Sequence, residues 1–97
     1  MQNTFNLENK VIAITGASSG FGHHFAGVLA ANGATVVLGA RRREKLDTAV
    51  EEIKAAGGNA MAATLDVTDK ASIEAFLDVA YTEFGRLDCV INNAGVE

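Results

Sequence analysis

The sequence predicts an α/β fold built on a parallel sheet, and three observations lead to this prediction. Short apolar runs alternate with longer stretches that carry apolar residues at helical spacing. Glycine is frequent, with 10 residues, and proline is absent, so glycine must build the turns. The strand–helix–strand order occurs three times in succession, which is typical of parallel strands joined by right-handed crossovers.

Four strands are expected, and the first two are the clearest. Residues 10–15 (KVIAIT) and 35–40 (TVVLGA) are short, continuous and rich in β-branched residues, as in strands covered on both faces. Residues 60–65 (AMAATL) form a weaker third strand with few β-branched residues. Residues 87–92 (LDCVIN) form the fourth.

Three amphipathic helices are expected between these strands, ending at Gly33, Gly57 and Gly85. The first would begin near Gly20 or Phe21. Thr68 or Asp69 could cap the third. The apolar residues expected to face the sheet are Phe21, Phe25, Val28 and Leu29, then Leu46, Ala49, Val50 and Ile53, then Ile73, Phe76, Leu77, Ala80 and Phe84.

Length and composition limit the function classes. Ninety-seven residues suffice for one domain, so residues 1–97 should form a single domain. No apolar run approaches the roughly 20 residues that span a bilayer, and the polar start shows no signal peptide. A net charge of −4 and one cysteine favour neither a nucleic-acid surface nor a metal cluster. We therefore expect a cytoplasmic protein with no nucleic-acid, membrane or metal partner.

A glycine-rich loop, residues 15–22 (TGASSGFG), follows the first strand and opens the first helix. The spacing Gly-x-x-x-Gly-x-Gly leaves a backbone that a diphosphate can approach closely, next to the free N–H groups of a helix start. Ser18 and Ser19 add hydroxyls that could bind phosphate or cap the helix. It is not a P-loop, because Phe21 and Gly22 follow Gly20. The alternative is a tight turn that only packs the helix on the strand.

Three motifs, in this order and at this spacing, resemble the amino half of the short-chain dehydrogenase/reductase family. They are residues 15–22 (TGASSGFG), Asp66-Val67 and residues 92–95 (NNAG), and the resemblance extends from about Lys10 to the last residue. It implies a Rossmann-type, doubly wound parallel sheet with strand order 3-2-1-4, present here as an incomplete dinucleotide-binding domain. Phe21 stands where the family usually carries isoleucine.

The resemblance also implies roles for individual residues. Asp66 would meet the adenine edge, with Val67 beside the ring, and Asn92 would tie the fourth strand to its neighbours. The alternatives are that Asp66 only starts a helix and that residues 92–93 only form a turn. The residues cradling the diphosphate would be Gly16, Ser18, Ser19, Gly20, Phe21 and Gly22, and those lining the ribose and nicotinamide would be Asn93, Ala94 and Gly95.

The end of the second strand predicts which dinucleotide is bound. An acid at this place would accept hydrogen bonds from the ribose 2′-hydroxyl and repel a 2′-phosphate. Ala40 occupies it here, followed by Arg41, Arg42 and Arg43. We expect Arg41 to bind the 2′-phosphate of NADP, so that NAD is the weaker ligand. Arg43 should be a solvated helix residue, and Arg42 could take either role.

Several reactive side chains are expected to have no part in catalysis. His23 should face solvent, His24 should be partly buried, and Cys89 should behave as a small hydrophobe in a buried strand. The family uses a Tyr-x-x-x-Lys pair with a serine and an asparagine, but Gly85 is the residue four after Tyr81. We therefore expect no catalytic residue in this chain.

The resemblance implies the cofactor-binding half of an NADP(H)-preferring oxidoreductase. The complete protein would transfer hydride between the nicotinamide and a carbonyl or alcohol, and could be a homo-oligomer. These 97 residues should not catalyse the reaction alone, and the fourth strand should be an unpaired edge. One alternative is a non-enzymatic dinucleotide-binding or interaction module completed by a partner chain. Another is a methyltransferase-like fold that binds adenosylmethionine.

Overall fold

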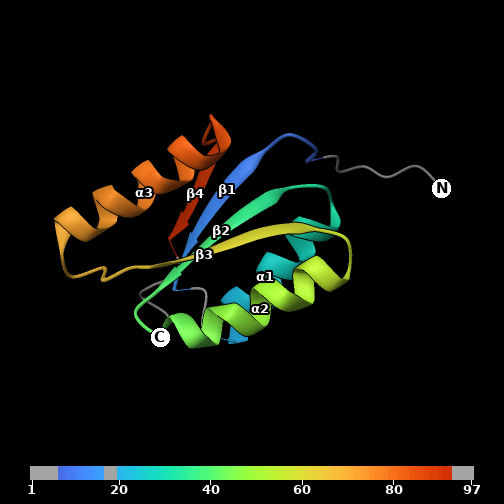
Figure 1. Ribbon diagram of the computed structural model, residues 1–97, viewed down its shortest axis with the longest axis horizontal. Coiled ribbons are helices and arrows are strands. Elements are labelled where there is room, and N and C mark those ends of the chain that lie inside the picture. Colours follow the sequence, from blue (N-terminus) through green and yellow to red (C-terminus); the bar gives the residue numbers. More distant parts are fainter. Residues whose placement is uncertain (1–6, 17–19, 93–97) are drawn as a thin grey trace.

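Four parallel strands form one sheet in the order β3-β2-β1-β4 (Figure 1). The computed structural model describes residues 7–16 and 20–92. Strand order and crossovers are those of the predicted doubly wound fold. The elements are β1 (Val11–Thr15), α1 (Gly20–Ala31), β2 (Thr35–Ala40), α2 (Arg43–Ala55), β3 (Asn59–Thr64), α3 (Lys70–Phe84) and β4 (Cys89–Asn92).

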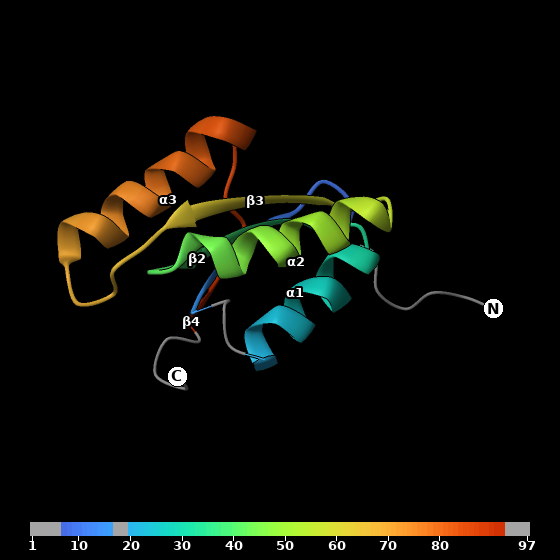
Figure 2. The same cartoon turned by 60° about the horizontal axis from the view of Figure 1, so that its bottom comes forward.

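The helices cover both faces of the sheet. Figure 2 shows α1 and α2 together on one face and α3 on the other. On the α1–α2 face, Ile14 and Leu38 of the sheet pack against Leu46 of α2. On the α3 face, Val37 packs with Leu65 and Phe76. The described helices are too short or too polar to cross a membrane.

The ends of α3 follow the local signals in the sequence. Of the two expected caps, Asp69 is the N-cap, and its carboxylate accepts a hydrogen bond from the N–H of Ala71 at 3.0 Å. Gly85 ends the helix with a left-handed φ of 77°, and its N–H donates to the carbonyl of Tyr81. A residue without a Cβ adopts this conformation at little cost.

The buried face of α1 differs from the expected one. Ala26 and Ala30 face the core, with exposed fractions of 0% and 8%, whereas Val28 is 42% exposed. Phe25 and Leu29 are only partly buried. Small residues face inward because α1 packs against both the sheet and α2, and a short side chain lets these elements approach closely.

Strand β4 lies at the edge of the sheet and is more exposed than its sequence predicts. Cys89 and Val90 are exposed, so the prediction that Cys89 is buried is wrong. The apolar run does predict a strand, and β4 pairs with β1 from Ile12 opposite Cys89 to Thr15 opposite Asn92. Among the described residues, no strand pairs with its outer edge. The predicted unpaired edge is thus present in this part of the chain.

Candidate functional site

The predicted site residues that the structure describes lie where the parallel strands reach their carboxyl ends. Thr15 of β1 pairs with Gly39 of β2 and with Asn92 of β4, and Ala40 pairs with Thr64 of β3. The carboxyl ends of all four strands therefore lie at neighbouring positions. Ligands of doubly wound sheets bind outside these ends, where the chain direction of the crossovers reverses.

Gly16 follows β1 and turns the chain away from the sheet. Its φ is 66°, a left-handed conformation that favours glycine, and the residue is buried. Helix α1 begins at Gly20, and Gly22 is buried within its first turn. Ser18, Ser19 and the side chain of Phe21 lie outside the described residues, as do Asn93, Ala94 and Gly95.

The three arginines after β2 occupy three different environments. The Arg41 side chain is 69% exposed and directs its Nη2 toward Oδ1 of Asp66, at 3.4 Å. Arg42 is the N-cap of α2 in extended conformation, without a side-chain capping bond. The Nε of Arg43 lies 3.8 Å from Oδ1 of Asp47, one helical turn further along α2. This pair agrees with the expectation that Arg43 is a solvated helix residue.

Asp66 is held by the loop that follows β3. Its Oδ1 accepts hydrogen bonds from the Thr68 hydroxyl at 2.6 Å and from the Thr68 N–H at 3.0 Å. The N–H of Asp66 donates to the hydroxyl of Ser72, at 2.9 Å, in the first turn of α3. The two Thr68 hydrogen bonds, followed by Arg41, hold the pKa of Asp66 below its usual range. Val67, the next residue, is 41% exposed.

Asn92 ties β4 to β1, as expected from the resemblance. The hydroxyl of Thr15 donates to Oδ1 of Asn92 at 2.9 Å, across the last residue pair of the two strands. The contact fixes the end of β4 beside Gly16. Asn93, Ala94 and Gly95 follow Asn92 directly in the sequence.

Sequence reasoning missed Thr68 and Ser72 as parts of this site, and it placed Thr15 in the glycine-rich motif without assigning it a contact. Thr68 was considered only as a helix cap, yet the structure gives that role to Asp69. The signal for Thr68 was present, because an aspartate two residues before a threonine often accepts hydrogen bonds from that residue. Nothing local marks Ser72 as the partner of Asp66 or Asn92 as the partner of Thr15, because both contacts depend on how the elements pack.

Two side chains expected to be inert lie differently from the prediction. His23 is half-buried, and its Nε2 lies 2.8 Å from Oε1 of Glu52 on α2, whereas His24 is exposed. The expected assignment of the two histidines is therefore reversed, because His23 lies on the side of α1 that meets α2. Tyr81 is exposed on α3.

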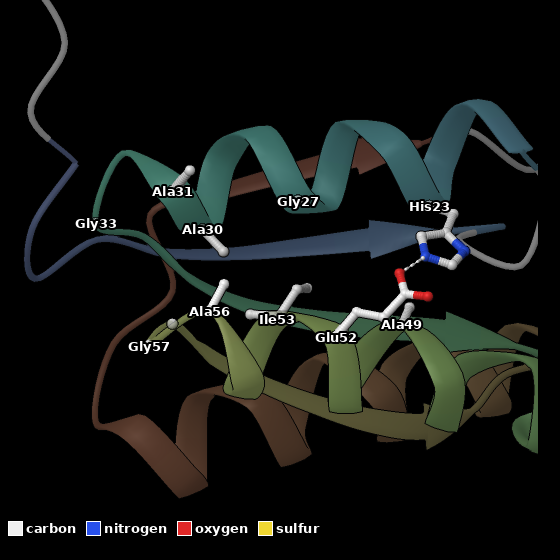
Figure 3. Close-up of a pocket in the computed structure, with 11 residues that line it drawn as sticks. His23, Gly27, Ala30, Ala31, Gly33, Ala49, Glu52, Ile53, Ala56 and Gly57 are labelled. Atoms are coloured by element: carbon white, nitrogen blue, oxygen red, sulfur yellow. Dashed lines mark hydrogen bonds and ion pairs between the residues drawn. The ribbon is translucent and has the colours of Figure 1, made fainter.

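A cavity of about 430 Å³ lies between α1 and α2 (Figure 3). The hydrogen-bonded His23 and Glu52 lie at one end of the cavity, and small residues such as Gly27, Ala30 and Ala56 line the rest of it. The cavity is separate from Arg41 and Asp66, which are not among its lining residues. It therefore does not belong to the site at the strand ends.

Comparison with known proteins gives one consistent result. The family model described as short chain dehydrogenase matches residues 10–97. An uncharacterized oxidoreductase of Listeria innocua is 46% identical over 90 residues, which are 93% of this chain and 36% of the relative. The chain thus spans little more than a third of the length of this curated relative.

Solved structures of the same kind superpose closely. A hydroxysteroid dehydrogenase from Escherichia coli has a TM-score of 0.87 and 33% identity, covering 90% of this chain and 37% of its own. A metagenomic short-chain oxidoreductase in complex with NADP has a TM-score of 0.83 and 40% identity, covering 87% and 38%. A protein assigned as a D-mannonate oxidoreductase from Haemophilus influenza, with bound NAD, has a TM-score of 0.84 and 34% identity, covering 89% and 31%.

Proposed function

This chain belongs to the short-chain dehydrogenase family, and we propose that it binds a nicotinamide dinucleotide across the carboxyl ends of its strands. We also propose that it prefers NADP(H) to NAD(H). One observation carries the preference. β2 ends at Ala40, the place where an acid would be needed to bind the 2′-hydroxyl of NAD, and the next residue, Arg41, has an exposed guanidinium.

The described part of the glycine loop fits a diphosphate. The backbone turns at Gly16 with a φ of 66°, and neither Gly16 nor Gly22 presents a side chain that could fill the space in front of the helix. The first N–H groups of any α-helix point away from the helix, and its dipole places partial positive charge there; α1 begins at Gly20. In the proposed complex, the remaining loop residues Ser18, Ser19 and Phe21 complete this cradle.

The neighbouring loops fit the adenosine end. Asp66 would accept from the adenine edge and Val67 would pack beside the ring, while Arg41 binds the 2′-phosphate. A charge-assisted hydrogen bond contributes about 1.5–3 kcal/mol, and exposure places Arg41 at the low end of that range. Because about 1.4 kcal/mol is a factor of ten, the preference for NADPH should be about tenfold. Asn93, Ala94 and Gly95 would line the nicotinamide end.

We propose hydride transfer to or from a carbonyl or alcohol as the reaction of the protein that contains this chain. The nicotinamide supplies the hydride when bound, and residues of this chain hold and orient it. The chain contains no Tyr-x-x-x-Lys pair, since Gly85 is the residue four after Tyr81. These residues therefore contribute cofactor binding and selectivity. The cytoplasmic location stays a prediction.

Titration of the protein with NADPH and NADH by calorimetry tests the proposal. The wild-type protein should bind NADPH about tenfold more tightly, because only NADPH offers a phosphate to Arg41. Arg41→Ala should weaken NADPH binding about tenfold and leave NADH binding within about twofold.

Arg43→Ala provides a matched control, because it removes an arginine that pairs with Asp47 on α2. This variant should retain the preference for NADPH. Equal affinity of the wild-type protein for both dinucleotides would contradict the preference, and binding of neither would contradict the dinucleotide site. Binding of adenosylmethionine instead would favour the methyltransferase-like alternative, against which the family assignment already speaks.

A non-enzymatic module completed by a partner chain is the second candidate function. The exposed outer edge of β4 favours it, since a strand from a partner could pair there. The two candidates share the cofactor site and differ in turnover. Oxidation of NADPH by a panel of small carbonyl compounds, measured on a longer protein that contains this chain, would support the oxidoreductase.

A further inference from the structure

Thr68 controls the orientation of the Asp66 carboxylate. The Thr68 hydroxyl and N–H both reach the same oxygen, Oδ1, at 2.6 and 3.0 Å. The backbone of Asp66 is fixed as well, because its N–H donates to the Ser72 hydroxyl at 2.9 Å. A half-exposed carboxylate would otherwise rotate freely, so these contacts determine where its negative charge lies.

The oxygen that Thr68 holds is also the oxygen that faces Arg41. The Arg41 Nη2 lies 3.4 Å from Oδ1, whereas the Thr68 hydroxyl lies 2.6 Å from it. Thr68 makes two hydrogen bonds with Oδ1, and both are shorter than the contact from Arg41. The position of the Asp66 carboxylate is therefore determined by its own loop. The position of the Arg41 guanidinium depends in turn on that of the carboxylate.

The arginine keeps most of its donors for a ligand. A guanidinium has five N–H donors, and the contact with Asp66 uses one nitrogen. Arg43 does not compete for Asp66, since it pairs with Asp47. A side chain already held in place loses less conformational entropy when it binds an anion than a freely rotating one.

We propose that Thr68 is a positioning residue for the choice between NADPH and NADH, acting through Asp66 to hold the Arg41 guanidinium where the 2′-phosphate binds. The inference rests on the proposed function and extends it, because it assigns selectivity to a residue that does not touch the phosphate. Loss of the Thr68 hydroxyl should therefore weaken the binding of NADPH more than that of NADH.

The test compares Thr68→Val with Thr68→Ser by calorimetric titration. Thr68→Val keeps the shape and removes the hydroxyl, and it should weaken NADPH binding about three- to tenfold while NADH binding changes less than about twofold. Thr68→Ser keeps the hydroxyl and should bind NADPH as the wild type does. Thr82→Val, at an exposed position near the end of α3, is the matched control and should change neither affinity.

A double variant shows whether Thr68 acts through Arg41. In an Arg41→Ala background, Thr68→Val should cause no further loss of NADPH affinity, because the two changes interrupt one chain of contacts. If Thr68→Val weakened NADPH binding in the Arg41→Ala background as much as it does in the wild type, Thr68 would act independently of Arg41. That result would overturn the proposal.

Carboxyl titration by carbon-13 NMR gives a readout without cofactor. Thr68→Val should raise the pKa of Asp66 toward its ordinary value of 3.8, and Thr68→Ser should not. An unchanged Asp66 titration would overturn the proposed contact chain. Equal weakening of NADPH and NADH, or a wild-type preference that survives Thr68→Val, would overturn this inference alone. Equal wild-type affinities would instead overturn the proposed preference together with it.

Discussion

Gly39 shows how one residue controls the packing of a helix on the sheet. A Cβ at this position would lie 2.7 Å from Cε1 of Phe76 and 2.9 Å from Cδ2 of Leu65. Both side chains are almost completely buried and cannot move away without disturbing the α3 face. The glycine therefore lets the Phe76 ring cover the strand two residues before Arg41.

We expect Gly39→Ala to lower the free energy of unfolding by about 1–3 kcal/mol, because the added methyl group overpacks a filled core. Gly27→Ala is the matched control. A Cβ at Gly27 meets nothing within 4 Å, so the substitution in α1 should raise the free energy of unfolding by about 0.5–1 kcal/mol. Urea denaturation measures both, and equal effects of the two changes would contradict this packing.

Residue type predicted the candidate site only in part. Arg41 and Asp66 could be named from their places after apolar runs and from the family resemblance. Their contact could not, because it joins residues 25 positions apart and depends on β2 pairing with β3. Thr68 is a local partner of Asp66 and could have been recognised from its spacing.

At the scale of elements, β4 is joined to the sheet by an acid at its start. Asp88 accepts from the N–H of Val11 at 2.8 Å, and its own N–H donates to the carbonyl of Val11. Arg86 binds both oxygens of the same carboxylate, at 2.9 and 2.8 Å. The hydrogen bonds from Arg86, followed by that from Val11, lower the pKa of Asp88.

Asp88 should make the stability of the sheet sensitive to acid. A folded-state pKa below the ordinary 3.8 means that the carboxylate stabilises the fold above that pH and that this contribution disappears as the pH falls through the folded-state value. We expect Asp88→Asn to lower the melting temperature at pH 7, and we expect its difference from the wild type to be smaller at pH 3.

Thermal unfolding followed by circular dichroism at the two pH values checks this prediction. Asp78→Asn, at an exposed position of α3, is the control and should leave the melting temperature nearly unchanged at both. A constant difference between Asp88→Asn and the wild type across the whole range would show that the ion pair with Arg86 makes no contribution.

At the scale of the whole molecule, helices cover both faces of the described sheet, and β3 and β4 form its two edges. The buried strands β1 and β2 lie in the middle, between β3 and β4. Val90 of β4 is 46% exposed, and Cys89 beside it is exposed too. An apolar strand edge of this kind is a template for pairing with another chain.

We therefore expect the protein to self-associate as its concentration rises, and Val90→Lys to reduce this association, because a charge at a strand edge opposes pairing. Sedimentation velocity in the presence of a reductant measures the effect without cross-linking through Cys89. Val79→Lys adds the same charge on α3, at a position that is 39% exposed, and should reduce association less. Equal effects of both variants would point to net charge rather than the edge.

The sequence alone determined the order of the elements and most of their ends. Apolar periodicity, the glycine at Gly85 and the acid at Asp69 are local signals, and local backbone preferences respond to them directly. The loop motif at Gly16 also needs only its immediate neighbours, since a left-handed φ is a property of one residue.

Tertiary structure decided which surfaces are buried and which loops meet. It placed alanines on the inner face of α1, left Cys89 exposed, and reversed the roles expected of His23 and His24. It also brought the loops after β2 and β3 together, so that Arg41 meets Asp66. These outcomes depend on strand pairing and on how closely helices approach, which no single segment of the sequence specifies.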